Sequence, residues 1–140
     1  MKKILIILCL ILCSCNVKEK YTLYVYYAPT CRVCDTLMKL VINDIEEEYR
    51  HEVDVIKMDI DKEEHIEAYA KTCTLLENYV FNEHSGDVPF LVLDGYFAKS
   101  GFEILESDEL KQDIINCIEN KQLPKNKEGI YYFKEGMKYK

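Results

Sequence analysis

The feature that most constrains this chain is a pair of cysteines, Cys31 and Cys34, between a strand-like run and a helix-like run. Residues 21–27 are β-branched or aromatic and apolar on both faces, which predicts a central strand covered on both sides. After Cys31 apolar residues recur every four positions from Leu37 to Tyr49, which predicts an amphipathic helix of about 18 residues. Thiol–disulfide exchange needs one thiolate to attack and a second thiol to resolve the mixed disulfide. Two cysteines this close at a helix start suit such a redox pair.

Strand and helix patterns alternate along the rest of the chain. The pattern predicts strands at 53–60, 88–93 and 96–99, a turn at Asp94-Gly95, and helices over 62–81 and from an N-cap at Ser107 to a point before Pro124. The predicted order β-α-β-α-β-β-α makes an α/β domain over residues 21–123, with a central mixed four-stranded sheet and helices on both faces. Residues 124–140 are a tail without an assigned structure.

The first residues form an export signal. Met1-Lys2-Lys3 precedes nine apolar residues, Ile4 to Leu12, which are too few for the roughly 20 that cross a bilayer and suit a signal-peptide core. The end of the run, Leu12-Cys13-Ser14-Cys15, resembles a bacterial lipobox. This resemblance implies that residues 1–14 are removed, that Cys15 is lipidated, and that residues 15–20 link the lipid to the domain. The alternatives are an ordinary signal peptide cleaved nearby and a short uncleaved anchor.

A Cys-x-x-Cys directly after the first strand, together with Val88-Pro89 opening the third, resembles the thioredoxin superfamily over residues 21–123. The resemblance implies a thioredoxin-like fold in which Cys31 is the nucleophile and Cys34 the resolving thiol. It also implies a cis Val88–Pro89 bond beside the disulfide. Val88, Pro89, Thr30 and Arg32 are then the residues expected to contact substrate. We expect the helix N-terminus and Arg32 to favour the Cys31 thiolate.

Four departures from the family pattern leave the direction of electron flow open. The residue before the first cysteine is Thr30 instead of Trp, and the Arg32-Val33 dipeptide matches neither reducing thioredoxins nor strong periplasmic oxidants. Val25 stands where thioredoxins proper carry a buried acid. The interval from Cys34 to Pro89 is also longer than in a minimal thioredoxin, with the extra residues around 74–87.

Other chemistries for the two cysteines are less well supported. A zinc site needs two more closely spaced ligands, and His51, His65 and His84 are scattered. A purely structural disulfide would close a very small loop and gain little stability. Cys73 and Cys117 fall on apolar helix stripes predicted to cover opposite faces of the sheet, so we expect buried free thiols. We therefore expect no metal and no cofactor beyond the Cys31–Cys34 disulfide.

The sequence thus predicts a membrane-anchored, extracytoplasmic thiol–disulfide oxidoreductase. Its partners would be the thiols and disulfides of exported proteins and a membrane redox partner. A net charge of −7 argues against nucleic acid, because phosphate binding requires clustered basic residues. The alternative function is a non-catalytic adaptor of the same fold that presents a binding surface to a membrane complex.

Overall fold

The computed structural model describes residues 18–140. The predicted signal peptide and the lipidation at Cys15 lie outside these residues. Within residues 18–140, no helix combines the length and the apolar character needed to cross a membrane.

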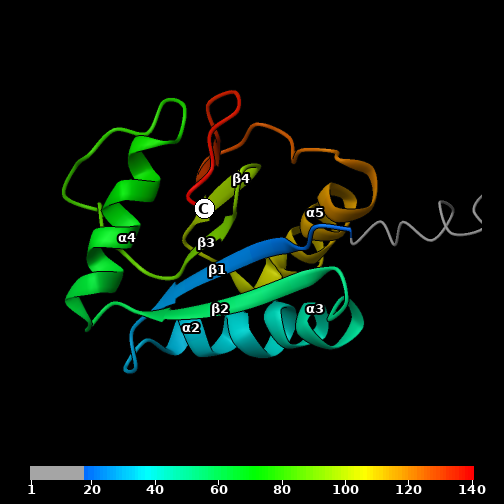
Figure 1. The fold of residues 1–140 in the computed structure, drawn as a ribbon. Helices are drawn as coiled ribbons and strands as arrows, with labels where there is room; N and C mark the ends of the chain where they lie inside the picture. Colours follow the sequence, from blue (N-terminus) through cyan, green and yellow to red (C-terminus); the bar gives the residue numbers. More distant parts are fainter. Residues whose placement is uncertain (1–17) are drawn as a thin grey trace, which may run out of the picture.

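A mixed five-stranded sheet forms the centre of the fold, in the order β2-β1-β3-β4-β5 (Figure 1). The strands are β1 (Tyr21–Tyr27), β2 (Val53–Asp59), β3 (Phe90–Leu93), β4 (Phe97–Ser100) and β5 (Ile130–Tyr132). β1 pairs in parallel with β2, from Tyr21 opposite Val53 to Tyr27 opposite Asp59, and antiparallel with β3. The α/β architecture is confirmed, and β1 has the predicted central place.

The prediction of four strands was wrong, because the C-terminal tail supplies a fifth. β5 pairs antiparallel with β4, and Phe133 then forms a bridge with Leu76. Gly129, just before β5, has a positive φ of 78°, and its carbonyl oxygen accepts a hydrogen bond from the Ser100 N–H at 2.8 Å. The tail is therefore packed onto the sheet through backbone hydrogen bonds. The short, lysine-flanked sequence of this segment does not predict them.

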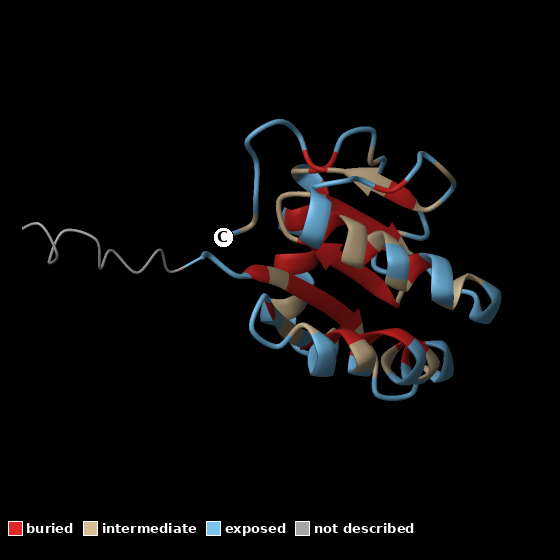
Figure 2. Cartoon of the chain, turned by 90° about the vertical axis from the view of Figure 1, so that its right-hand side faces the viewer, coloured by how far each residue is buried: buried red, intermediate tan, exposed pale blue. Residues whose placement is uncertain are grey.

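The helices cover both faces of the sheet (Figures 1 and 2). One face packs against a continuous helical run, made of α2 (Arg32–Leu37), the π-helical segment Met38–Ile42 and α3 (Asn43–Glu48), and against α5 (Ser107–Asn120). The other face packs against α4 (Glu63–Thr74). A short 3₁₀ helix, Ile104–Glu106, leads into α5. Figure 2 shows the buried strands between helices whose outer sides are exposed.

Two helix boundaries differ from the sequence prediction. α4 ends at Thr74 and not near Phe81, because the tail binds the backbone that follows: Lys134 N–H donates to the Leu75 carbonyl and Glu77 N–H to the Tyr132 carbonyl. Ser107 is the first residue of α5 and not its N-cap, since the preceding 3₁₀ turn carries the capping interactions.

Candidate functional site

The site centres on a disulfide between Cys31 and Cys34, whose Cα atoms lie 5.2 Å apart. Cys34 is buried, with 1% of its surface exposed, whereas Cys31 is partly exposed. Of the two cysteine side chains, only that of Cys31 can be reached by another molecule from solvent. The structure therefore distinguishes an outer and an inner sulfur within the pair.

The start of α2 positions the outer sulfur. Cys31 is the N-cap of α2 and not, as the sequence had suggested, the first helical residue; the helix begins at Arg32, and Cys34 N–H donates to Cys31 Sγ at 3.1 Å. A helix N-terminus has backbone N–H groups without intrahelical partners and a partial positive charge. When the pair is reduced, the same N–H and the helix dipole would stabilise negative charge on Cys31 Sγ.

The segment before β3 lies against this sulfur. The Val88–Pro89 peptide bond is cis, and the carbonyl oxygen of Val88 is 3.9 Å from Cys31 Sγ. Pro89 is buried and Val88 is partly exposed. Two residues fifty-seven positions apart in sequence, Cys31 and Val88, thus meet at one end of the sheet.

Thr30 and Arg32 flank Cys31 on the surface. Both residues are exposed, and neither side chain forms an ion pair or hydrogen bond within residues 18–140. The structure thus brings Cys31, Cys34, Val88 and Pro89 together. It leaves Thr30 and Arg32 at the rim, where they are available to a bound partner.

The residues that hold the 87–89 segment in place could not be recognised from the sequence pattern. The hydroxyl of Tyr69, on α4, donates to the Asp87 carbonyl at 3.0 Å. On the other side, Gly101 N–H donates to the Pro89 carbonyl at 3.0 Å. The sequence showed Tyr69 only as part of an apolar helical stripe. Apolar periodicity does not show which loop the hydroxyl of a tyrosine will contact.

An apolar hollow adjoins this segment through Tyr69. It has a volume of about 330 Å³, and its lining includes Ile60, Ile66, Tyr69, Ala70 and Phe81. Ile66 and Phe81 are more than half exposed, which is unusual for side chains of this size. The hollow lies between α4 and the 81–87 loop.

The remaining described cysteines do not join the site. Cys73 and Cys117 are free thiols buried in separate cores on opposite faces of the sheet, as the topology predicted. Burial raises the pKa of each thiol to about 11. Buried, protonated thiols are poor nucleophiles, so these two are structural.

Among residues 18–140 there is no group of three or more His, Cys, Asp or Glu side chains placed to hold a metal ion.

A scan against protein-family models found no match, and searches of curated proteins and of solved structures found no similar protein either.

Proposed function

We propose that this protein is a thiol–disulfide oxidoreductase of the thioredoxin fold that acts on exported proteins from a lipid anchor at Cys15. The observation that carries the proposal is the disulfide at the start of α2, with Cys31 partly exposed and its sulfur 3.9 Å from the Val88 carbonyl oxygen. A disulfide that served only stability would gain little from so short a loop and would not need an exposed sulfur.

The reaction is a pair of thiol–disulfide exchanges. In the reducing direction, the Cys31 thiolate attacks one sulfur of a substrate disulfide, and the other substrate sulfur leaves as a thiolate. Cys34 then loses its proton and attacks Cys31 Sγ, which breaks the mixed disulfide and releases the second substrate thiol. Two electrons pass to the substrate, and the Cys31–Cys34 disulfide re-forms. A membrane redox partner must then reduce it, and the oxidising direction is the exact reverse.

The surroundings of Cys31 suit a polypeptide substrate. The Val88 backbone beside the sulfur offers hydrogen-bonding groups to an extended chain. Val33, between the two cysteines, is 46% exposed, and the apolar hollow beside Tyr69 can receive a larger side chain. Main-chain pairing next to apolar contacts would allow binding with little dependence on sequence.

Turnover by cysteine variants tests the proposal. The full chain in detergent should catalyse the reduction of insulin by dithiothreitol, and Cys31→Ser should abolish this activity. Cys34→Ser should accumulate mixed disulfides with exported proteins through Cys31. The matched controls are Cys73→Ala and Cys117→Ala, which remove thiols outside the site and should retain turnover.

Full activity in Cys31→Ser would refute the mechanism. A wild-type chain that turns over no disulfide but still binds a membrane protein would favour the non-catalytic adaptor. For an active chain, the reduction potential of the Cys31–Cys34 couple decides the direction. A value of about −270 mV indicates a reductant, and one of about −120 mV an oxidant.

A further inference from the structure

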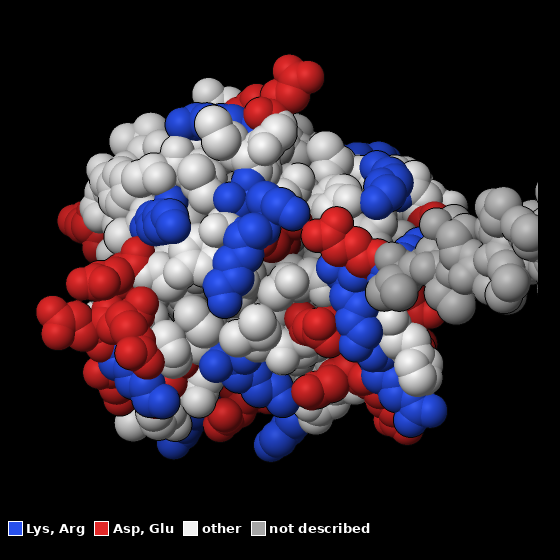
Figure 3. Space-filling model, in the orientation of Figure 1, with Lys and Arg blue, Asp and Glu red and all other residues white. Residues whose placement is uncertain are grey.

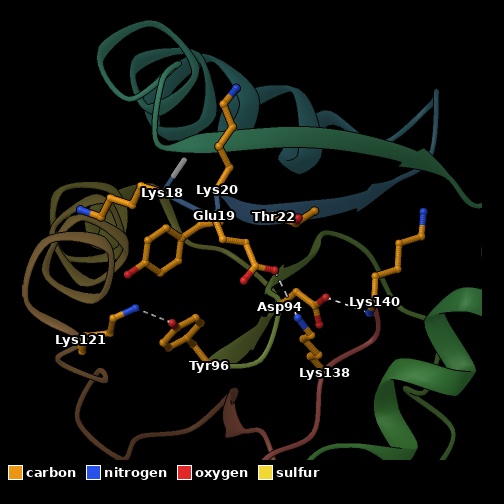
Figure 4. A pocket seen from close by; sticks show the side chains of 10 residues that line it. Lys18, Glu19, Lys20, Thr22, Asp94, Tyr96, Lys121, Lys138 and Lys140 are labelled. Atoms are coloured by element: carbon orange, nitrogen blue, oxygen red, sulfur yellow. Dashed lines mark hydrogen bonds and ion pairs between the residues drawn. The ribbon is translucent and has the colours of Figure 1, made fainter. Parts of the chain in front are cut away.

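A second hollow lies at the end of β1 remote from the disulfide, where the described chain begins (Figure 4). It has a volume of about 320 Å³. Its lining contains two acids, Glu19 and Asp94, and five lysines: Lys18, Lys20, Lys121, Lys138 and Lys140. We call this site the lysine pocket. Its residues come from four parts of the chain, namely the start of β1, the turn between β3 and β4, the end of α5 and the C-terminal tail, so the fold assembles it.

Contacts within the lysine pocket hold some of its charges in place. Lys121 Nζ donates to the Tyr96 hydroxyl at 2.8 Å and lies 4.7 Å from the centre of the Tyr21 ring. Lys138 pairs with Glu19 at 3.4 Å. Both carboxylate oxygens of Asp94 accept backbone N–H groups of the tail, from Tyr139 and Lys140. The acids therefore anchor the tail, and basic groups remain in excess.

Lys18 and Lys140 supply most of this excess. Within residues 18–140, neither ammonium group has a hydrogen bond or an ion pair, and both residues are exposed. Lys20 reaches outward to Asp54 at 2.8 Å.

The charge of the lysine pocket contrasts with the rest of the protein. The chain carries a net charge of −7, yet five of its eighteen basic residues line this one hollow. Acidic side chains gather elsewhere, as on the side of the molecule where α4 lies (left of Figure 3). Glu63, Glu64 and Glu67 in the first half of α4 are exposed. Such a charge distribution orients the molecule towards a negatively charged surface.

The position of the lysine pocket identifies that surface. Lys18 lies only three positions after Cys15, so even a fully extended linker spans about 10 Å. This distance is close to the Debye length of about 8–10 Å at physiological ionic strength. If Cys15 carries the lipid, the lysine pocket lies within electrostatic reach of the headgroups.

We propose that the lysine pocket docks on the anionic phospholipid headgroups of the membrane that holds the protein. The proposal rests on the lipid anchor at Cys15, and it does not depend on the redox activity. Because β1 runs from the lysine pocket towards Cys31, docking turns the disulfide away from the bilayer. Seven strand residues place the two ends about 20 Å apart. The anchor supplies attachment, and the lysine pocket supplies orientation.

Site-resolved amine labelling tests the docking. The full chain is reconstituted on vesicles of phosphatidylcholine alone or with phosphatidylglycerol, collected by flotation, and treated with a water-soluble acetylating ester. Mass spectrometry then gives a rate for each lysine. We expect the Lys138 rate to fall by about threefold or more on the anionic vesicles, and the effect to fade at high salt. Lys39 and Lys62, exposed residues outside the lysine pocket, should keep their rates.

Charge reversal provides the matched control. Lys18→Glu with Lys140→Glu should remove the protection of Lys138, whereas Lys39→Glu with Lys62→Glu, the same charge change elsewhere, should leave it intact. All four side chains are exposed, so each variant keeps the packed core.

Three other results would contradict the proposal, and each would refute a different part of it. Flotation with both vesicles and equal Lys138 rates refutes the docking surface alone. Failure to float with either vesicle refutes the anchor and the surface together. Equal protection by soluble glycerol phosphate on phosphatidylcholine vesicles would mean a site for small anions and not a membrane surface.

Discussion

Removing the two buried thiols should make the protein less sensitive to alkali. Cys73 and Cys117 are 1% and 0% exposed, and burial raises the pKa of each from 9.0 to about 11. Above pH 9 the unfolded chain therefore loses these two protons while the folded chain keeps them. The contribution of the two thiols to stability is fully present below their pKa in the unfolded chain. It is lost as the pH rises through their pKa in the folded chain.

The size of the effect follows from proton linkage. Between the unfolded-state and the folded-state pKa, each thiol lowers the free energy of unfolding by about 1.4 kcal/mol per pH unit. The two thiols together therefore lower it by about 3 kcal/mol per unit. Two units would remove about 5 kcal/mol, comparable with the whole stability of a marginal domain. Burial also raises the pKa of Tyr24 and Tyr26 to about 12, so both tyrosines add to alkaline unfolding above their ordinary value of 10.0.

Urea unfolding at a series of pH values measures this slope. The disulfide is kept oxidised, and the wild type is compared with Cys73→Ala/Cys117→Ala, which retains both tyrosines. The double variant should be less stable at neutral pH, because it loses buried sulfur contacts. From about pH 9 to about pH 10.5, the free energy of unfolding should fall with pH in both proteins. The fall should be steeper in the wild type than in the double variant, by about 3 kcal/mol per pH unit. Equal slopes would refute the placement of the two thiols in dry cores.

Three further predictions concern the tail and the site. Phe133→Ala should destabilise the fold by about 3–5 kcal/mol in urea unfolding, since Phe133 is 8% exposed, while the exposed Glu135→Ala should change stability by less than about 0.5 kcal/mol. Gly129→Ala should cost about 2 kcal/mol more than Gly136→Ala. Both glycines have positive φ, but only at Gly129 would a Cβ meet a backbone atom, the Ser100 carbonyl oxygen at 2.7 Å, and equal losses would contradict this packing. Tyr69→Phe should lower stability by about 1 kcal/mol and raise the KM for a protein disulfide more than it lowers kcat, because it frees the Asp87 carbonyl beside the site. An unchanged KM would show that this hydrogen bond does not position the 87–89 segment.

The central part of the fold could be predicted because its burial pattern is simple. β1 is apolar on both faces, and its predicted bounds agree with the structure. The apolar stripes of α4 and α5 were recognised for the same reason, and they placed Cys73 and Cys117 on opposite faces. Cys31 and Cys34 were recognisable because their chemistry depends on local spacing.

The first helix shows what periodicity alone could not predict. Its apolar residues, Leu37, Val41 and Ile45, recur every four residues, whereas an α-helix turns every 3.6 residues. Over several turns such a stripe would rotate away from the sheet. The π-helical segment Met38–Ile42 widens the turn, and all three side chains remain buried in one core. The sequence contained this signal, but the prediction assumed a regular helix.

The tail could not be predicted because its structure depends on tertiary contacts. β5 is three residues long, and its partners are β4 and the segment after α4. Likewise, the distance between Cys31 and Val88 was expected only from a family resemblance, since no local pattern relates residues so far apart.

The fifth strand also decides how the sheet meets other molecules. A strand at the edge of a sheet exposes unpaired backbone groups and can recruit a strand from another chain. At one edge, β2 carries the exposed charges of Asp54 and Lys57, which discourage such pairing. At the other edge, the short β5 covers β4, whose Phe97 and Ala98 are fully buried. A chain cut after α5 would leave β4 open, and we expect it to self-associate.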